Sequence, residues 1–304
     1  MVLAAVAVAA ALSPLGAGDY VRYVATLWLV YAIATIGLQI PIGLASIYSF
    51  GHGAFMLIGA YAVGLGVLNG VPIPLAMLAG VLIAAAVGAA LALPSLRLSG
   101  FALAIVTLGA ASLFFQGVKA FKITGGAQGL FLPYVPLAKM AEGRVFYLIA
   151  LCLVVMAVAV SHCIDHGPVG RSLRAAAANP LMAQTFGVHL LKVRTTAFVI
   201  SAMYGAVSGS LLGLLVGYIA PEAFSPELSI QIFAAVMIGG SGRYWGAALG
   251  ALFIVLIPEL TQSVQNGGAI IYALLFTLVA TLCPGGLLQL LTPAFRRLRG
   301  ARAG

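Results

Sequence analysis

Residues 145–162 read VFYLIALCLVVMAVAVSH, an apolar run that contains no Asp, Glu, Lys or Arg. A helix needs about 20 mostly apolar residues to cross the hydrocarbon core of a bilayer, so this stretch predicts a transmembrane helix. The same pattern recurs along the chain and predicts about ten membrane segments (8–10), two of them short for a full crossing. The segments are 1–16, 21–39, 51–69, 73–93, 101–118, 145–162, 195–219, 228–240, 245–260 and 268–291.

The composition of the whole chain supports this interpretation. Of the 304 residues, 63% are hydrophobic and 7% are charged, and the mean hydropathy is +1.15. Soluble domains carry about 25% charged residues, so a water-soluble globular fold is excluded. We expect an all-α polytopic transmembrane bundle, with residues 1–304 in one domain and some segments short or discontinuous. Residues 1–16 lack a basic n-region, which favours a retained helix over a cleaved signal peptide.

The charges of the loops predict the orientation in the membrane. If both termini are cytoplasmic, ten of the fifteen Lys and Arg residues lie inside, in agreement with the positive-inside rule. They are Arg97, Arg171, Arg174, Lys192, Arg194, Arg243, Arg296, Arg297, Arg299 and Arg302. Five of the six acidic residues then lie outside or at the outer ends of the segments, and the basic loop 119–144 is the exception. The net charge of +9 is thus a topology signal, and we expect no nucleic-acid partner.

Several function classes lack the residues that they require. An ion-coupled carrier usually buries a carboxylate, and no Asp or Glu lies in the middle of a predicted segment. Sodium held by backbone carbonyls stays open as an alternative. The chain has no GxxxxGK[ST] nucleotide loop, so any ATP must be bound by another polypeptide. We predict no catalytic residue, no metal site and no cofactor, and the three cysteines lack ligand spacing.

Two segments carry glycines at i+4 spacing, which places the glycines on one helix face and lets a second helix approach closely. These residues are Gly205, Gly209, Gly213, Gly217, Gly246 and Gly250. We predict that they pack helices within the bundle. A sliding interface beside a translocation route stays open as the alternative.

The stretch SIYSFGHGAF at residues 46–55 interrupts an apolar run with polar residues and glycines. Such a break survives at membrane depth only where protein or a water-filled cavity satisfies the freed backbone groups. A helix that starts here would offer N–H groups to a substrate carboxylate, and Phe50 and Phe55 would bound an apolar side chain. We predict Ser49 and His52 as the first polar contacts of a substrate path, with a packing role as the alternative for His52. The path residues predicted here are Ser49, Phe50, Gly51, His52, Gly53 and Phe55.

Residues 119–144 form an outer loop that contains a tight, glycine-rich turn. The turn residues are Thr124, Gly125, Gly126 and Gly129, and prolines stiffen the chain that follows. Because no strand–turn–helix pattern surrounds the turn, we predict a docking or gating loop rather than a phosphate site.

A basic and largely polar stretch, GRSLRAAAANPLMAQTFGV at residues 170–188, lies between two apolar segments. Asn179 is a good N-cap, Pro180 suits the first helical position and Gly187 suits the C′ position. Residues 180–186 therefore predict a two-turn helix outside the bilayer.

One face of this short helix is apolar, and arginines flank it. Such a helix fits a groove on a soluble partner, and a simple connector between two spans is the alternative. We therefore predict that loop 163–194 is a cytoplasmic coupling loop. Its coupling residues are predicted to be Arg171, Arg174, Asn179, Leu181, Met182, Ala183, Phe186 and Gly187.

A series of motifs in this order resembles the permeases of branched-chain amino acid ABC transporters. The motifs are SFGHGAF (49–55), RLSG (97–100), AIVTL (104–108), TGGAQGL (124–130), GRSLRA (170–175) with MAQTFG (182–187), AFVISA (197–202), and GGSG (239–242) with WG (245–246). Each motif alone is weak, but together they span roughly residues 30–290. The resemblance also places Thr107 on the substrate path. The chain departs from the family at Met182, where importers have a small residue, and at Ala247, where proline is frequent.

The resemblance implies the permease subunit of an ATP-driven importer for branched-chain or other hydrophobic amino acids. The implied partners are a homologous second permease, two ABC ATPase subunits that use ATP and Mg, an extracytoplasmic substrate-binding protein and membrane lipid. The implied location is the bacterial cytoplasmic (inner) membrane, with several crossings and no enzymatic reaction in this chain. Transport of urea or short-chain amides by the same machinery is one alternative. An ion-coupled secondary amino-acid carrier is the other.

Overall fold

The computed structural model describes most of the chain. The described residues are 18–96, 98, 100–132, 143–240 and 244–260, with the single residues 271, 274 and 277. The predicted segment 1–16 lies outside these ranges, as do both termini and all of segment 268–291 except those three residues.

Every predicted segment within the described ranges forms a helix. The helices are α2 (Asp19–Gln39), α3 (His52–Leu68), α4 (Ile73–Ala92), α5 (Gly100–Ala120), α7 (Arg144–His166), α10 (Leu190–Val216), α11 (Pro226–Gly239) and α12 (Tyr244–Leu260). The largest difference from the predicted bounds is the start of α10. Hydropathy marks only the apolar part of this helix, and the backbone continues through Lys192 and Arg194 because both are good helix formers.

Five helical stretches among the described residues are long and apolar enough to cross a membrane. They are Asp19–Leu44, Ile73–Leu96, Gly100–Ala120, Arg144–His166 and Leu190–Val216. Two further apolar helices, His52–Leu68 and Tyr244–Glu259, are shorter. The chain is therefore a multi-pass helical membrane protein, and a total of about ten segments stays a prediction.

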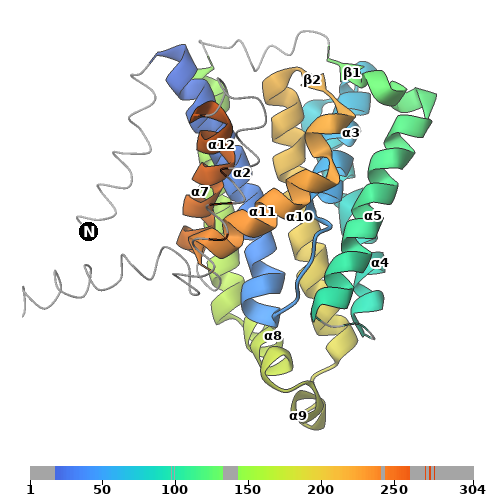
Figure 1. Ribbon diagram of the computed structural model, residues 1–304, viewed down its shortest axis with the longest axis vertical. Coiled ribbons are helices and arrows are strands. Elements are labelled where there is room, and N and C mark those ends of the chain that lie inside the picture. Colours follow the sequence, from blue (N-terminus) through green and yellow to red (C-terminus); the bar gives the residue numbers. More distant parts are fainter. Residues whose placement is uncertain are drawn as a thin grey trace, which may run out of the picture.

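Helix α10 is the centre of the bundle (Figure 1). It packs against α2, α3 and α4, while α7 and α12 pack on the other side of α2. Helix α5 lies beside α3 at the far edge of the bundle, and α11 crosses obliquely near mid-height. The short helices α8 (Pro168–Ala178) and α9 (Pro180–Thr185) project from one end. The strands β1 (Leu130–Phe131) and β2 (Tyr218–Ile219) lie at the opposite end.

Glycines let α3 and α10 meet with their backbones in contact. A Cβ atom on Gly209 would lie 2.5 Å from the carbonyl carbon of Met56, and one on Gly205 would lie 2.8 Å from the Cβ of Phe55. A Cβ on Gly213 would meet a neighbouring side chain at 3.1 Å. The predicted glycine face of α10 is therefore its contact face with α3 and the strand that follows α10.

Glycines also bring the backbones of α11 and α12 into contact. The last predicted glycine of α10, in contrast, makes no such contact. A Cβ on Gly250 would lie 2.7 Å from the carbonyl carbon of Ala235, and one on Gly246 would lie 3.0 Å from that of Gly239. Gly217, however, follows the end of α10 with φ +72° and has no described atom within 4 Å of a Cβ position. The packing role predicted for Gly217 is wrong because a glycine at i+4 can end a helix instead of extending its face.

Candidate functional site

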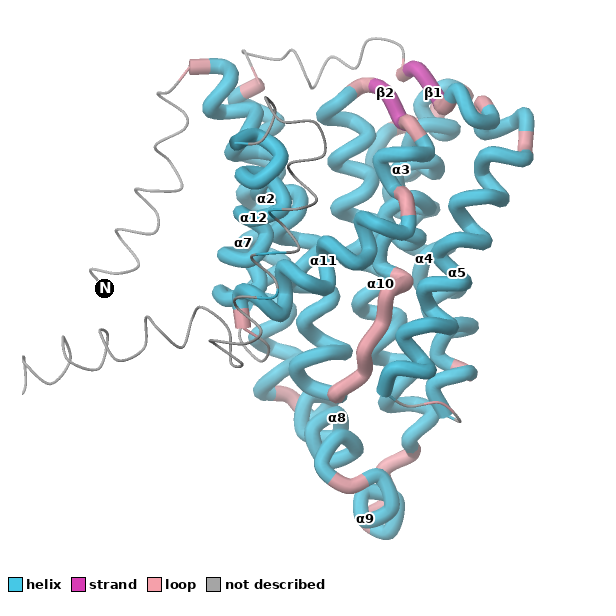
Figure 2. The backbone as a smooth tube through the Cα atoms, viewed as in Figure 1, coloured by secondary structure: helices cyan, strands magenta, loops and turns pink. Residues whose placement is uncertain are grey.

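The predicted break at residues 46–55 is present. Helix α2 continues into a π-helical turn, η2 (Ile40–Leu44), and α3 begins only at His52. Between them, residues 46–51 have no helical backbone. Figure 2 shows this segment as the loop that runs from the α8 end of the molecule into the middle of the bundle. Pro41 within η2 supplies no N–H to the helix ladder, which favours the end of α2 at this point.

Side chains from distant helices satisfy the backbone of this broken segment and of the first turn of α3. The N–H of Phe50 donates to Oγ1 of Thr107 on α5 at 2.9 Å. The N–H of Gly53 donates to Oγ of Ser229 on α11, also at 2.9 Å. A buried N–H without a partner is costly, so these two hydroxyls hold the irregular backbone at this depth.

The predicted polar contacts of the path are buried. Ser49 is 3% exposed, and its Oγ accepts a hydrogen bond from the N–H of Gly51 at 3.3 Å. His52 has no exposed surface, and its Nδ1 lies 3.3 Å from Oγ of Ser201 on α10. Gly205 leaves room for the imidazole ring, because a Cβ there would lie 3.3 Å from Nε2 of His52. That nitrogen has no hydrogen-bond partner among the described residues. This environment favours the packing alternative for His52.

The exposed side of the broken segment is aromatic. Side chains alternate there as in a strand, so Tyr48 is 39% exposed and Phe50 is partly exposed, whereas Ser49 between them is buried. The ring of Phe233 on α11 packs edge-on against both, with ring centroids 4.7 Å from Phe50 and 6.1 Å from Tyr48. We call Tyr48, Phe50 and Phe233 the aromatic face.

Phe55 does not belong to the aromatic face. It is 1% exposed and lies in an apolar cluster with residues of α4 and α10. The expectation that Phe50 and Phe55 together bound a substrate side chain is therefore wrong, because one helical turn carries Phe55 to another side of α3. Phe233 occupies the place beside Phe50 instead. Sequence reasoning missed Phe233 and Ser229, although Ser229 is a polar residue inside the predicted segment 228–240.

The predicted outer loop is tied to the connection between α10 and α11. Strands β1 and β2 pair antiparallel, with Leu130 opposite Ile219. Nζ of Lys119 lies 2.9 Å from a carboxylate oxygen of Glu222. This hydrogen-bonded ammonium holds the pKa of the Glu222 carboxyl below its ordinary value.

The turn residues give the outer loop its tight shape. Thr124 is nearly buried, and its hydroxyl donates to the carbonyls of the preceding turn. Gly125, Gly126 and Gly129 have φ of +76°, +59° and +72°, values that favour glycine. Pairing and turn together make residues 119–132 a compact cap at this end of the bundle. Residues 133–142 of the predicted loop lie outside the described ranges.

At the opposite end, α9 has the capped form that the sequence predicts. The side chain of Asn179 accepts a hydrogen bond from the N–H of Met182 at 3.0 Å, and Pro180 occupies the first turn. Gly187 has φ +80°, and the N–H of Val188 donates back to the carbonyl of Ala183 at 3.0 Å. These bonds form a Schellman cap.

Helix α9 presents large apolar side chains to the outside. Leu181, Met182 and Phe186 are 77%, 59% and 81% exposed. Ala183, in contrast, is 4% exposed and faces its own chain. The prediction that Ala183 contacts a partner is therefore wrong, since the predicted face of α9 points outward and Ala183 lies on the opposite side.

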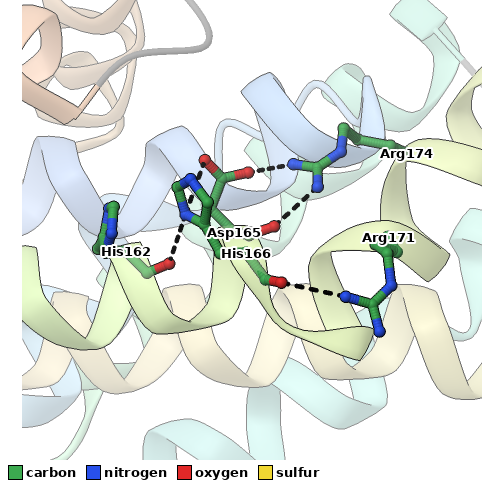
Figure 3. A network of polar contacts seen from close by, with 5 residues as sticks. All are labelled: His162, Asp165, His166, Arg171 and Arg174. Carbon is green, nitrogen blue, oxygen red and sulfur yellow. Dashed lines mark hydrogen bonds and ion pairs between the residues drawn. The ribbon is translucent and has the colours of Figure 1, made fainter.

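Arg171 and Arg174 of α8 are directed at the end of α7 (Figure 3). Arg174 donates to the carboxylate and, at 2.7 Å, to the backbone carbonyl of Asp165. Arg171 donates to the carbonyl of His166 at 3.1 Å. Sequence reasoning did not single out Asp165, although it is the one acidic residue in the predicted loop 163–194.

The predicted sites are thus separated along the bundle. Helix α11 and the end of the broken segment, which carry the aromatic face, lie near mid-height, α8 and α9 lie at one end, and the outer loop lies at the other (Figure 1). Residues 97, 99, 241 and 242, which belong to two of the quoted motifs, lie outside the described ranges.

Comparison with known proteins identifies the family of this membrane bundle. The family model described as "Branched-chain amino acid transport system / permease component" matches residues 20–282. The high-affinity branched-chain amino acid transport system permease protein LivM of Escherichia coli is 30% identical, over 92% of this chain and 73% of that protein. LivH of Escherichia coli is 27% identical, over 86% of this chain and 92% of LivH. The probable LivM of Methanocaldococcus jannaschii is 28% identical, over 77% and 79%.

No solved structure gives a significant match to this chain. The family assignment therefore rests on the sequence matches, which cover most of the bundle described above. The chain belongs to the permease-component family of branched-chain amino acid transport systems.

Proposed function

We propose that this chain is the permease subunit of an ATP-driven importer that moves branched-chain or other hydrophobic amino acids across the bacterial cytoplasmic membrane. The family match over residues 20–282 carries this proposal. The assembly would contain a homologous second permease, two ATPase subunits on the α9 side and a substrate-binding protein on the side of the outer loop. This chain would bind no ATP and make or break no bond of the substrate.

The form of α9 supports docking to an ATPase subunit. An exposed apolar face on a helix held by caps at both ends is unusual on a surface that stays in water. The end of the bundle that carries α9 also carries Lys192, Arg194 and the arginines of α8, which favours the cytoplasmic side.

The aromatic face supports passage of apolar side chains. Tyr48, Phe50 and Phe233 offer ring surface and no charge to a passing molecule. Such a surface attracts an apolar side chain weakly and without strict shape selection. Urea and short-chain amides lack a comparable apolar group, so this face favours hydrophobic amino acids over them.

The proposal is tested in vesicles that contain the permease pair, the ATPase subunits and the binding protein. We expect leucine uptake to require ATP on the side of the membrane that carries the ATPase subunits. Ionophores should not reduce this uptake. Uptake that continues without ATP and collapses with an ionophore would instead identify an ion-coupled carrier. Uptake of urea but not of leucine would reject the proposed substrate class.

Docking is tested with single cysteines in a chain whose native cysteines are replaced. Phe186→Cys should crosslink to an ATPase subunit in the assembled complex. Phe131→Cys is the matched control in complexes assembled without the binding protein, because Phe131 is 75% exposed on the opposite end of the bundle. Free labelling of Phe186→Cys by maleimide in the assembled complex, equal to that of the control, would show that α9 is not the docking helix.

A further inference from the structure

The end of helix α7 is capped by residues of the next helix. The last carbonyls of a helix have no partner within it and need donors from elsewhere. Here Nη2 of Arg174 donates to the carbonyl of Asp165 at 2.7 Å, and Nη1 of Arg171 donates to the carbonyl of His166 at 3.1 Å. Both guanidinium groups also place positive charge at the negative end of the α7 dipole.

A carboxylate completes this contact and makes it specific. Nη1 of Arg174 donates to the side chain of Asp165, so one guanidinium grips both the carboxylate and the carbonyl of a single residue (Figure 3). Two hydrogen bonds from one guanidinium group fix the orientation of that group as well as its distance from Asp165. Side-chain exposure is 23% for Asp165 and 47% for Arg174, so the contact is partly shielded from water.

Two glycines let α8 approach α7 this closely. A Cβ on Gly170 would lie 2.8 Å from the carbonyl carbon of Asp165, and one on Gly167 would lie 2.7 Å from the carbonyl oxygen of Cys163. Any larger residue at either position would push α8 away and open the arginine contacts. The corner between α7 and α8 is therefore packed as a rigid elbow, which we define as Asp165, Gly167, Gly170, Arg171 and Arg174.

The buried side of α8 packs against η2, the turn that precedes the broken segment. Leu173 has no exposed surface and lies in the same apolar cluster as Ile42 and Leu44 of η2. Helix α8 contacts η2 directly. Because residues 46–51 follow η2, a displacement of α8 acts on the base of the broken segment.

We propose that the rigid elbow makes α8 a lever that transmits force from α9 to η2 and the broken segment, with Asp165 and Arg174 as positioning residues. This inference rests on the proposed function, in which α9 docks on an ATPase subunit. Arg171 and Arg174 then hold α8 in place through contacts within this chain. Leu181, Met182 and Phe186 make the contact with the ATPase. Without the elbow, a load on α9 would rotate α8 about its corner instead of moving η2.

The test measures leucine uptake and ATP hydrolysis together in vesicles with the complete complex. The variants are Asp165→Asn, Arg174→Gln and the double variant, and crosslinking from Phe186→Cys reports docking in each background. Asp19→Asn is the matched control, because Asp19 also pairs with an arginine, Arg22 at 2.8 Å, at the other end of the bundle. Asp165→Glu keeps a carboxylate and serves as the rescue variant.

We expect the uptake per ATP hydrolysed to fall about threefold in each single variant, as for the loss of a partly exposed ion pair. The double variant should fall no further than Arg174→Gln alone, because Arg174→Gln already breaks the side-chain contact that Asp165→Asn removes. Crosslinking from Phe186→Cys should stay unchanged. Asp165→Glu should keep most of the parent's uptake per ATP hydrolysed, and Asp19→Asn should not lower it.

Three results would overturn the inference. One is an unchanged uptake per ATP in both single variants. Another is a double variant whose loss is the product of the two single losses. The third is loss of the crosslink together with uptake, since the arginines would then serve docking itself. If Phe186→Cys fails to crosslink in a chain whose elbow is intact, the proposed docking of α9 is rejected, and the lever, which rests on that docking, is rejected with it.

Discussion

Substitution of Gly209 by alanine tests the backbone contact between α3 and α10. The added Cβ would lie 2.5 Å from the carbonyl carbon and 2.6 Å from the Cα of Met56. Carbon atoms in contact prefer about 3.5–4.0 Å, so the two helices must separate by roughly 1 Å. Overpacking costs about 1–3 kcal/mol, and the upper value applies because the obstacle is backbone that cannot rotate away. Alanine regains about 1 kcal/mol of helix propensity, which leaves a net loss of about 2 kcal/mol.

This loss is measured as the thermal unfolding temperature of the purified protein in detergent. About 2 kcal/mol corresponds to a decrease of about 3 °C, because the unfolding entropy of about 2.1 cal/mol/K per residue grows with the length of the chain. Gly109→Ala on α5 is the matched control, because no described atom lies within 4 Å of its Cβ position. This variant should gain about 1 kcal/mol from helix propensity alone and unfold at the same or a higher temperature. Equal unfolding temperatures for the two variants would refute the close contact of α3 and α10.

Three further predictions concern the path and the outer loop. Thr107→Val keeps the shape of the side chain but leaves the N–H of Phe50 without its acceptor. The free energy of unfolding should therefore fall by about 1–3 kcal/mol, and leucine uptake should fall as well. Unchanged stability and uptake would show that this hydrogen bond is dispensable. His52 is fully buried against α10, so His52→Ala should lower the unfolding temperature and leave leucine uptake by the assembled complex close to normal, whereas slowed uptake at unchanged stability would assign His52 to the path. The pKa of Glu222 is lowered by Lys119, so the pair stabilises the outer loop above the ordinary carboxyl pKa and loses this effect as the pH falls through the lowered value. Glu222→Gln should therefore unfold at a lower temperature than the parent chain at pH 7 and at the same temperature at strongly acidic pH, and a gap that persists in acid would contradict the ion pair.

Features encoded within a few neighbouring residues were predictable from the sequence. Apolar runs marked the five described helical stretches that are long enough to cross a membrane, because lipid requires about 20 such residues in a row. The helix at α9 followed from Asn179, Pro180 and Gly187, since capping depends on groups three or four residues apart. The break before α3 was also visible, because polar residues and glycines at membrane depth need a special backbone.

Features that depend on which helix faces which were decided only by the tertiary structure. The sequence separates Phe50 from Thr107 by 57 residues and Gly53 from Ser229 by 176, so no local pattern links each N–H to its acceptor. Helix rotation buries Phe55 and brings Phe233 to Phe50 instead.

The two ends of the coupling segment show the same division. Asn179 and Gly187 act on their own helix, and the sequence alone determined their capping roles. The roles of Ala183 and Arg174 depended on the packing of α9 and α8 against the rest of the chain. Local hydrogen bonds are set by spacing along the chain, whereas burial and the choice of a distant partner are set by the packing of the whole bundle, and only the tertiary structure contains that packing.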